Sequence, residues 1–218
     1  MNPDYPPRLD EEVQKQAISE LIGIEPVFSE VVENYGLPPF WQREENFGSL
    51  IQIILEQQVS LASARAAYDR LSTVLGQVTP DNVLKLSDNQ LKEIGFSRQK
   101  SSYARNLASA LLDGDLDLAH LKTLPDDQIR AALTAIKGIG IWTANIYLLM
   151  AMRRPDIWPR GDIALAASYQ QLKQLAQRPD NDGMARISKA WSPHRSVAAR
   201  LLWHNYLSRK KTSPKTAV

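Results

Sequence analysis

The chain has 218 residues, a net charge of +2, three histidines and no cysteine. The lack of cysteine excludes disulfides, thiolate zinc sites, cysteine-ligated iron–sulfur clusters and a cysteine nucleophile. The length allows one domain or two interlocked halves. No apolar run reaches the roughly 18 residues of a membrane span, and the N-terminus lacks the layout of a signal peptide, so we expect a soluble, cytoplasmic protein.

Charge is distributed unevenly along the chain. Residues 1–35 carry eight acids against two bases, Arg8 and Lys15, whereas residues 191–218 carry six bases and no acid. The C-terminal stretch can face phosphates, or residues 209–218 can simply form a solvated basic tail.

The first strong helical pattern spans residues 47–58 and follows Asn46. It is apolar on almost all sides, which is typical of a helix buried in the centre of a bundle. Ser60 is placed to cap the next helix, which Gly76 ends. The apolar stripe of that helix recurs at helical spacing and consists of Ala64, Ala67, Tyr68, Leu71 and Leu75.

Further helix boundaries are marked by capping residues. Thr79 precedes a proline in a first turn, and Ser87 with Gln90 forms a capping box before a short helix that ends at Gly95. Residues 98–112 carry another apolar stripe.

The later part of the chain is interrupted by proline and polar clusters, and Ser192-Pro193 begins a final helix that runs to about Ser208. No stretch alternates apolar and polar residues for long enough to indicate a strand. The sequence therefore predicts an all-α fold.

The most informative segment is residues 133–165, LTAIKGIGIWTANIYLLMAMRRPDIWPRGDIAL. We expect a helix to end at Lys137, Gly138-Ile139-Gly140 to form a tight turn, and a second helix to begin with Thr143. The two glycines let another backbone approach closely, and they expose amide N–H groups where the partial positive charge of the helix favours a phosphate oxygen. This arrangement predicts a sequence-independent DNA anchor.

The residues GIGIWTA, followed by Pro159-Arg160-Gly161-Asp162, resemble the hairpin, Gly/Pro-rich loop and aspartate signature of the helix-hairpin-helix (HhH-GPD) superfamily of DNA glycosylases. Leu55 to Ser60 resembles the family's Q-Q-x-S turn, which enters the minor groove. Trp191 to Ser196, with Leu202-Trp203, resembles the closing helix of the 3-methyladenine DNA glycosylase II or alkylpurine branch. The similarity runs from about residue 45 to 208.

The resemblance implies two helical subdomains with the active-site cleft between them. Subdomain A would span about 48–162, with the helix-hairpin-helix at 128–153 and the catalytic loop at 155–162. Subdomain B would consist of about 1–47 plus 163–218.

Asp162 matches the aspartate of the signature and is the predicted catalytic residue. Cleavage of an N-glycosidic bond builds positive charge on the sugar, so a carboxylate beside the anomeric carbon stabilises the transition state and can orient water. The sequence fits a helix N-cap for the segment from Ile163 equally well, and the two roles are compatible.

Trp142 and Trp203 correspond by motif to pocket aromatics of the alkylpurine branch, where an indole face attracts a cationic base. Either tryptophan can instead belong to the core. For Trp158 and Trp191 we expect core or loop packing. Relatives that resemble endonuclease III carry a nucleophilic lysine at the position of Trp142, so the resemblance implies hydrolysis without lyase activity.

By motif Gln58 is the wedge that fills the gap left by a flipped base, and Gln57 supports the turn. Without the rest of the pattern, both glutamines would be read as a helix end that faces water. The phosphate-binding hairpin would consist of Lys137, Gly138, Ile139, Gly140 and Thr143. The family's hairpins often hold a sodium or potassium ion, here at the carbonyls of Lys137, Ile139 and Gly140, and no cofactor is required.

The resemblance thus predicts a monofunctional, monomeric glycosylase that removes alkylated purines of the 3-methyladenine or 7-methylguanine type from duplex DNA. Its location would be cytoplasmic, associated with the nucleoid when bound to DNA, or nuclear in a eukaryote. The alternatives are a glycosylase for an oxidised or deaminated base and a non-catalytic helix-hairpin-helix DNA-binding protein.

Overall fold

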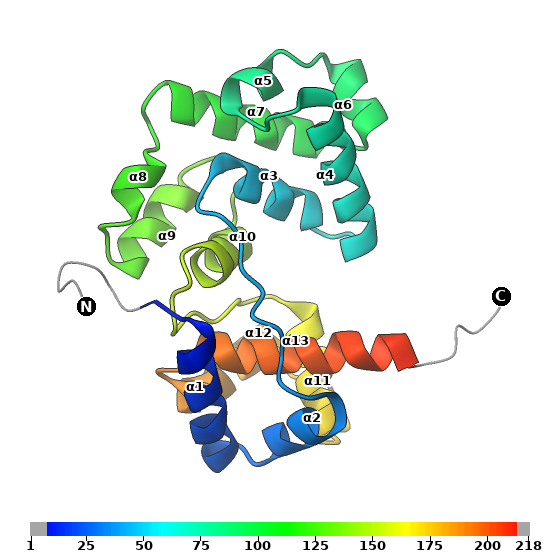
Figure 1. Cartoon of the computed structure of the whole chain (residues 1–218), viewed down its shortest axis with the longest axis vertical. Helices are drawn as coiled ribbons and strands as arrows, with labels where there is room; N and C mark the ends of the chain where they lie inside the picture. Colours follow the sequence, from blue (N-terminus) through cyan, green and yellow to red (C-terminus); the bar gives the residue numbers. More distant parts are fainter. Residues whose placement is uncertain (1–7, 213–218) are drawn as a thin grey trace. The chain divides into compact units, whose positions relative to one another are not determined.

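The structure, a computed structural model, describes residues 8–212 and divides the chain into two compact units (Figure 1). Unit 1 comprises residues 43–152, and unit 2 comprises residues 8–42 together with 153–212. The all-α prediction is confirmed, because the described residues form thirteen α-helices, one 3₁₀ helix and one π-helical turn, and no strand. None of these helices is long and apolar enough to cross a membrane.

Unit 1 is built around helix α3, which is buried on nearly every side. Asn46 caps the helix by accepting a bond from the Ser49 amide at 2.9 Å. Helices α4, α7 and α10 all pack against it (Figure 1). The elements of the unit are α3 (Phe47–Glu56), α4 (Leu61–Leu75), α5 (Pro80–Leu84), α6 (Asp88–Ile94), α7 (Arg98–Leu112), α8 (Leu118–Leu121), α9 (Asp126–Thr134), α10 (Ile141–Ile146) and the π-helical turn η1 (Tyr147–Ala151).

The predicted caps of unit 1 are confirmed. Ser60 and Thr79 accept amide bonds at the starts of α4 and α5, and Ser87 with Gln90 forms the capping box of α6. Ser97 caps α7 in the same way. Helix α3, however, ends two residues earlier than expected, because Gln57 leaves the helical conformation, with φ −59° and ψ 121°, and its side chain binds the hairpin.

The two helices of the hairpin differ from the predicted bounds. Helix α9 ends at Thr134 rather than at Lys137, and α10 already begins at Ile141. The connection therefore contains six residues, 135–140, in place of a three-residue turn.

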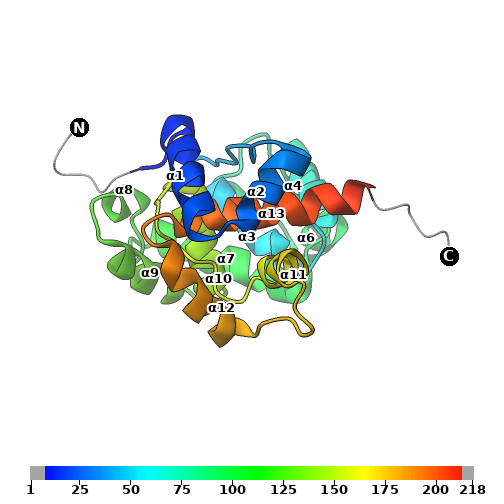
Figure 2. The same cartoon turned by 90° about the horizontal axis from the view of Figure 1, so that it is seen from below.

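Unit 2 combines segments from both parts of the chain. Helix α13 packs against α11 and against α1 and α2, as Figure 2 shows from below. It begins at Arg195 rather than at Ser192, and it continues past Ser208. The elements are α1 (Glu11–Ile24), α2 (Val27–Tyr35), α11 (Ile163–Leu172), α12 (Asn181–Ile187), the 3₁₀ helix η2 (Ser188–Trp191) and α13 (Arg195–Thr212).

An aromatic cluster forms the core of unit 2. The Trp191 ring lies 5.4 Å from Phe28, 5.5 Å from Trp158 and 5.6 Å from Tyr169, measured between ring centroids. Edge-on and tilted contacts of this kind stabilise a core beyond the area that they bury. Trp158 and Trp191 were expected in the core or in loop packing, and both are buried in this core.

The division between the units differs from the expected subdomains. Residues 155–162 were expected with the first subdomain but belong to unit 2, whereas residues 43–47 belong to unit 1. The Arg43 amide donates to Met150 O at 3.0 Å, which explains the placement of the second segment. The end of the basic tail, residues 213–218, lies outside the described residues.

Candidate functional site

Asp162 is the N-cap of α11, as the sequence allowed. Its Oδ1 accepts the amides of Ala164 at 2.9 Å and Leu165 at 3.2 Å. The residue as a whole is half-buried. Two amide bonds and the favourable end of the helix dipole fix the orientation of a negative charge here.

Trp203, on α13, contacts the other oxygen of the same carboxylate. Its indole N–H donates to Asp162 Oδ2 at 3.3 Å, and the ring is 8% exposed. The structure thus brings together two of the predicted site residues within unit 2. The contact is one that the sequence did not predict, because Trp203 was expected to act through the face of its ring.

The loop before Asp162 is held at several points. Gly161 has a φ of +91°, a conformation that suits glycine. Arg160 forms an ion pair with Asp182 at the start of α12. Trp158 packs into the aromatic core, which anchors the loop four residues before Asp162.

Residues 55–60 form the turn that carries the predicted wedge Gln58, here called the wedge turn. Gln57 joins this turn to the hairpin within unit 1. Its Nε2 donates to Gly138 O at 3.0 Å and to Thr143 Oγ1 at 2.9 Å. The next residue, Gln58, is exposed and has a φ of +57°, which is uncommon for a residue with a side chain. The turn therefore presents Gln58 to solvent while Gln57 bonds to the hairpin, and the wedge role of Gln58 stays a prediction.

The hairpin approaches α7 closely at Gly138. A Cβ added there would lie 2.3 Å from Tyr103 Cγ, and φ at this residue is +109°. Lys137 is exposed, and its carbonyl accepts a bond from Asn106 of α7 at 3.2 Å. The structure thus shows a close approach at the first glycine, but it is the side chain of Tyr103 that lies there and not the backbone that the two glycines predicted.

One of the predicted phosphate contacts needs correction, and another is limited to the backbone. Thr143 is 1% exposed and its hydroxyl binds Gln57, so only its backbone amide is left for the predicted phosphate contact, which stays a prediction. The Ile139 amide donates to Ile136 O at 3.0 Å within the turn. Of the predicted hairpin residues, Lys137 and Gly140 are exposed, while Gly138 is half-buried.

The carbonyls proposed for an alkali cation are partly engaged. Lys137 O accepts the bond from Asn106, and Gly140 O accepts the Ala144 amide at 3.0 Å as the first bond of α10. A carbonyl oxygen has a second lone pair, so these bonds leave some capacity for an ion. The cation stays a prediction.

Trp142 lies in unit 1 on α10 and is half-buried, between the exposed Ile141 and the buried Thr143. A contact of Trp142 with a base stays a prediction.

Several residues around the wedge turn were missed by the sequence analysis. Lys100 Nζ donates to Leu55 O at 2.6 Å at the end of α3, and burial lowers the pKa of this lysine. Val59 and Leu61, 45% and 55% exposed, place apolar surface on either side of Ser60. Helical periodicity does not identify such residues, because it reports which side chains are buried and not which apolar ones are left outside.

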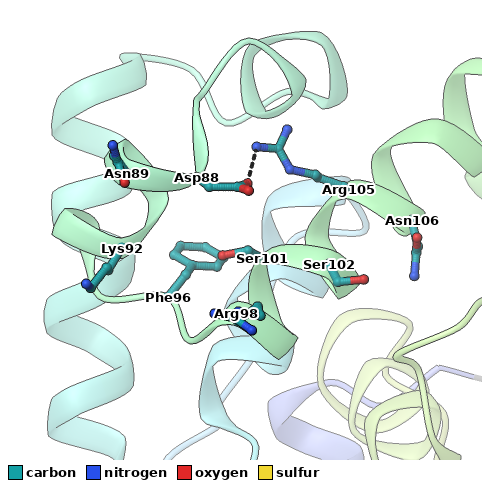
Figure 3. Close-up of a pocket in the computed structure, with 9 residues that line it drawn as sticks. All are labelled: Asp88, Asn89, Lys92, Phe96, Arg98, Ser101, Ser102, Arg105 and Asn106. Carbon is teal, nitrogen blue, oxygen red and sulfur yellow. Dashed lines mark hydrogen bonds and ion pairs between the residues drawn. The ribbon is translucent and has the colours of Figure 1, made fainter.

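A separate pocket of about 540 Å³ lies in unit 1 between α6 and α7 (Figure 3). Arg105, which lines the pocket, donates to Leu86 O at 2.6 Å and to Asp88 Oδ1 at 3.0 Å. These bonds attach the connection between α5 and α6 to α7. None of the predicted site residues lines this pocket. The lining consists of Asp88, Asn89, Lys92, Phe96, Arg98, Ser101, Ser102, Arg105 and Asn106.

Known proteins resemble the chain over most of its length. It is 27% identical to the Bacillus subtilis protein YfjP, provisionally named a DNA-3-methyladenine glycosylase, over 81% of this chain but only 64% of that protein. It is also 27% identical to DNA-3-methyladenine glycosylase 1 of Schizosaccharomyces pombe, over 79% of this chain and 78% of that protein.

A solved structure has the same fold. The 3-methyladenine DNA glycosylase Mag1 of Schizosaccharomyces pombe, in complex with abasic DNA, superposes with a TM-score of 0.79 at 26% identity, covering 86% of this chain and 95% of that one. The family model of the HhH-GPD superfamily matches residues 51–194, which contain the wedge turn, the hairpin and Asp162. The chain therefore belongs to the HhH-GPD superfamily of base excision DNA repair proteins.

Proposed function

We propose that the protein is a monofunctional DNA glycosylase that hydrolyses the N-glycosidic bond of alkylated purines of the 3-methyladenine or 7-methylguanine type in duplex DNA. One observation carries the proposal: the carboxylate of Asp162, a half-buried residue, is held by two amides on one oxygen and by the Trp203 indole on the other. The names of the relatives support the substrate class.

Asp162 would act on the sugar. As the bond to the purine breaks, the base leaves with the bonding electrons and the deoxyribose becomes electron-deficient. A fixed carboxylate stabilises that charge and orients the water whose oxygen then bonds to the anomeric carbon. An alkylated purine with a formal positive charge is already a good leaving group, so the protein needs little acid catalysis.

Unit 1 would bind the DNA backbone and minor groove. The exposed Lys137 and the start of α10 suit phosphate oxygens, whereas the exposed Gln58 suits the gap that a flipped base leaves. The neighbouring Val59 and Leu61 offer apolar surface to the minor groove. These contacts are to backbone and groove, so we expect binding without sequence preference and with strong dependence on salt.

The first experiment is an assay of base release from a panel of duplexes with methylated, oxidised or deaminated bases. We expect free methylpurine from the methylated duplex, with loss of release in Asp162→Asn and little change in DNA affinity. Release of oxidised or deaminated bases without any methylpurine would overturn the substrate class. Undiminished release by Asp162→Asn would remove this residue from the mechanism.

The absence of lyase activity is tested separately. Trp142 stands where bifunctional relatives carry a lysine, so no Schiff base can form there. Borohydride added during the reaction should trap no covalent protein–DNA adduct, and a trapped adduct would overturn the monofunctional assignment. The same preparation should elute as a monomer on size exclusion with light scattering.

A further inference from the structure

The loop that ends at Asp162 is hydrogen-bonded to the first turn of α13. Ser196 lies in that turn and is fully buried. Its Oγ donates to Arg154 O at 2.7 Å and accepts the Ile157 amide at 2.9 Å, and its own amide donates to Pro155 O at 3.0 Å. This one residue thereby pairs with the loop backbone at three points, as a neighbouring strand would.

A second contact holds the same stretch of loop from its outer side. Arg195 donates to both carboxylate oxygens of Asp156, Nε to Oδ1 at 2.7 Å and Nη2 to Oδ2 at 2.9 Å. Ser192 adds a hydroxyl bond to Oδ2 at 2.8 Å. Forked arginine–carboxylate pairs of this kind fix geometry as well as charge. The segment before Asp162 is therefore held at its backbone and at a side chain.

Helix α13 holds the loop near its start and at its end. Ser196 and Trp203 are seven residues apart on this helix, roughly 10 Å along its axis. Ser196 holds the loop near Arg154 and Ile157, and Trp203 contacts the carboxylate at its end. The helix is one rigid element, so displacement of the loop at Ser196 would change where the carboxylate lies relative to the indole.

We propose that Ser196 is a positioning residue for the glycosylase reaction: it fixes the loop so that Asp162 lies beside the anomeric carbon. The inference rests on the proposed function, since it assigns Ser196 a role that acts through Asp162. A displacement of about 1 Å in a catalytic group can cost about a hundredfold in rate. We expect an effect between about ten- and a hundredfold on the chemical step.

The test compares Ser196→Ala with Ser188→Ala. Ser188 is a matched control because it is also buried in unit 2, but its hydroxyl donates to Ala185 O and not to the loop. The single-turnover rate of methylpurine release and the dissociation constant for duplex DNA are measured well below the unfolding temperature of each variant. Ser196→Ala should release base ten- to a hundredfold more slowly at unchanged affinity, and Ser188→Ala at the wild-type rate.

A wild-type rate for Ser196→Ala, or equal slowing in both variants, would overturn the inference. The double variant with Asp162→Asn gives a second readout: Ser196→Ala should slow the residual reaction no further, because its effect passes through the missing carboxylate. If Ser196→Ala slowed the Asp162→Asn variant as much as it slows the wild type, the inference would also be overturned.

Failure of the proposed function looks different in the same experiment. If Asp162→Asn releases base at the wild-type rate, the catalytic assignment itself is wrong whatever Ser196 does. Should Ser196→Ala not fold, Arg195→Ala tests the same loop from outside. It should slow release at unchanged affinity, and Arg195→Lys should recover part of the rate because lysine retains one of the two bonds. A wild-type rate for Arg195→Ala would overturn the inference in that case.

Discussion

Trp203 binds Asp162 through the edge of its indole: Nε1 lies 3.3 Å from Oδ2, on the side of the carboxylate opposite to the two amides of α11. A tryptophan that uses its N–H in this way contributes more than a flat surface. It fixes the carboxylate in one rotamer, so two elements that are distant in the sequence define the position of a single charge.

Trp203→Phe separates these two contributions, because phenylalanine keeps an aromatic face but has no donor. A hydrogen bond to a charged acceptor contributes about 1.5 kcal/mol, so we expect about a tenfold slower single-turnover release of methylpurine. Trp203→Ala, which loses the ring as well, should be slower still and should bind the lesion less tightly. An unchanged rate in Trp203→Phe would show that only the ring matters.

Gln57→Ala should loosen the wedge turn, since it removes the bonds to Gly138 O and Thr143 Oγ1. We expect a loss of about 1–2 kcal/mol in stability and weaker base flipping, read from the fluorescence of 2-aminopurine beside the lesion. Gln57→Glu should be worse, because a carboxylate would face the Gly138 carbonyl. Gln58→Ala is the comparison: it should weaken flipping without loss of stability, and equal destabilisation of the two variants would contradict this division of roles.

The two hairpin glycines should differ sharply when replaced by alanine. Gly138→Ala places a Cβ 2.3 Å from Tyr103 Cγ at a positive φ and should cost about 3 kcal/mol or more of unfolding free energy. Gly140 has a φ of −86° and no atom within 4 Å of an added Cβ, so Gly140→Ala should cost less than about 1 kcal/mol. Urea denaturation of the two variants measures the difference, and similar losses would contradict it.

Asp156 should make stability depend on pH in the acid range. Burial alone would raise the pKa of this carboxyl, but the bonds from Arg195 and Ser192 and the charge of Arg195 outweigh it and lower the pKa below its ordinary value of 3.8. A lowered folded pKa means that the stabilisation is present above the ordinary value and is lost as the pH falls through the folded one. The gap in unfolding free energy between wild type and Asp156→Asn should therefore shrink between pH 5 and pH 3. A constant gap would contradict the assignment.

The capping residues and the short motifs predicted much of this molecule. Local chemistry determines a cap, so Ser60, Ser87 and Asp162 could be identified from their neighbours in the sequence alone. The hairpin glycines likewise indicated a close approach, but the neighbour of Gly138 is the side chain of Tyr103 rather than the backbone that was expected.

Contacts between distant segments could not be predicted in this way. The bonds of Gln57 to the hairpin and of Ser196 to the loop join residues far apart in the chain, and no periodicity encodes such pairs. The π-helical turn at Tyr147–Ala151 had no signal either. The start of α13 was placed three residues early because Ser192 resembles a cap, whereas its hydroxyl binds Asp156.

The two described segments of unit 2 precede and follow residues 43–152 in the sequence, and α1 and α2 of the first segment pack on α13 of the second. During synthesis, residues 43–152 emerge as one uninterrupted stretch, while the apolar faces of α1 and α2 stay uncovered until α13 has been made. Trp203 belongs to that helix. A polypeptide released before residue 203 would therefore carry the hairpin but lack the indole that binds the Asp162 carboxylate.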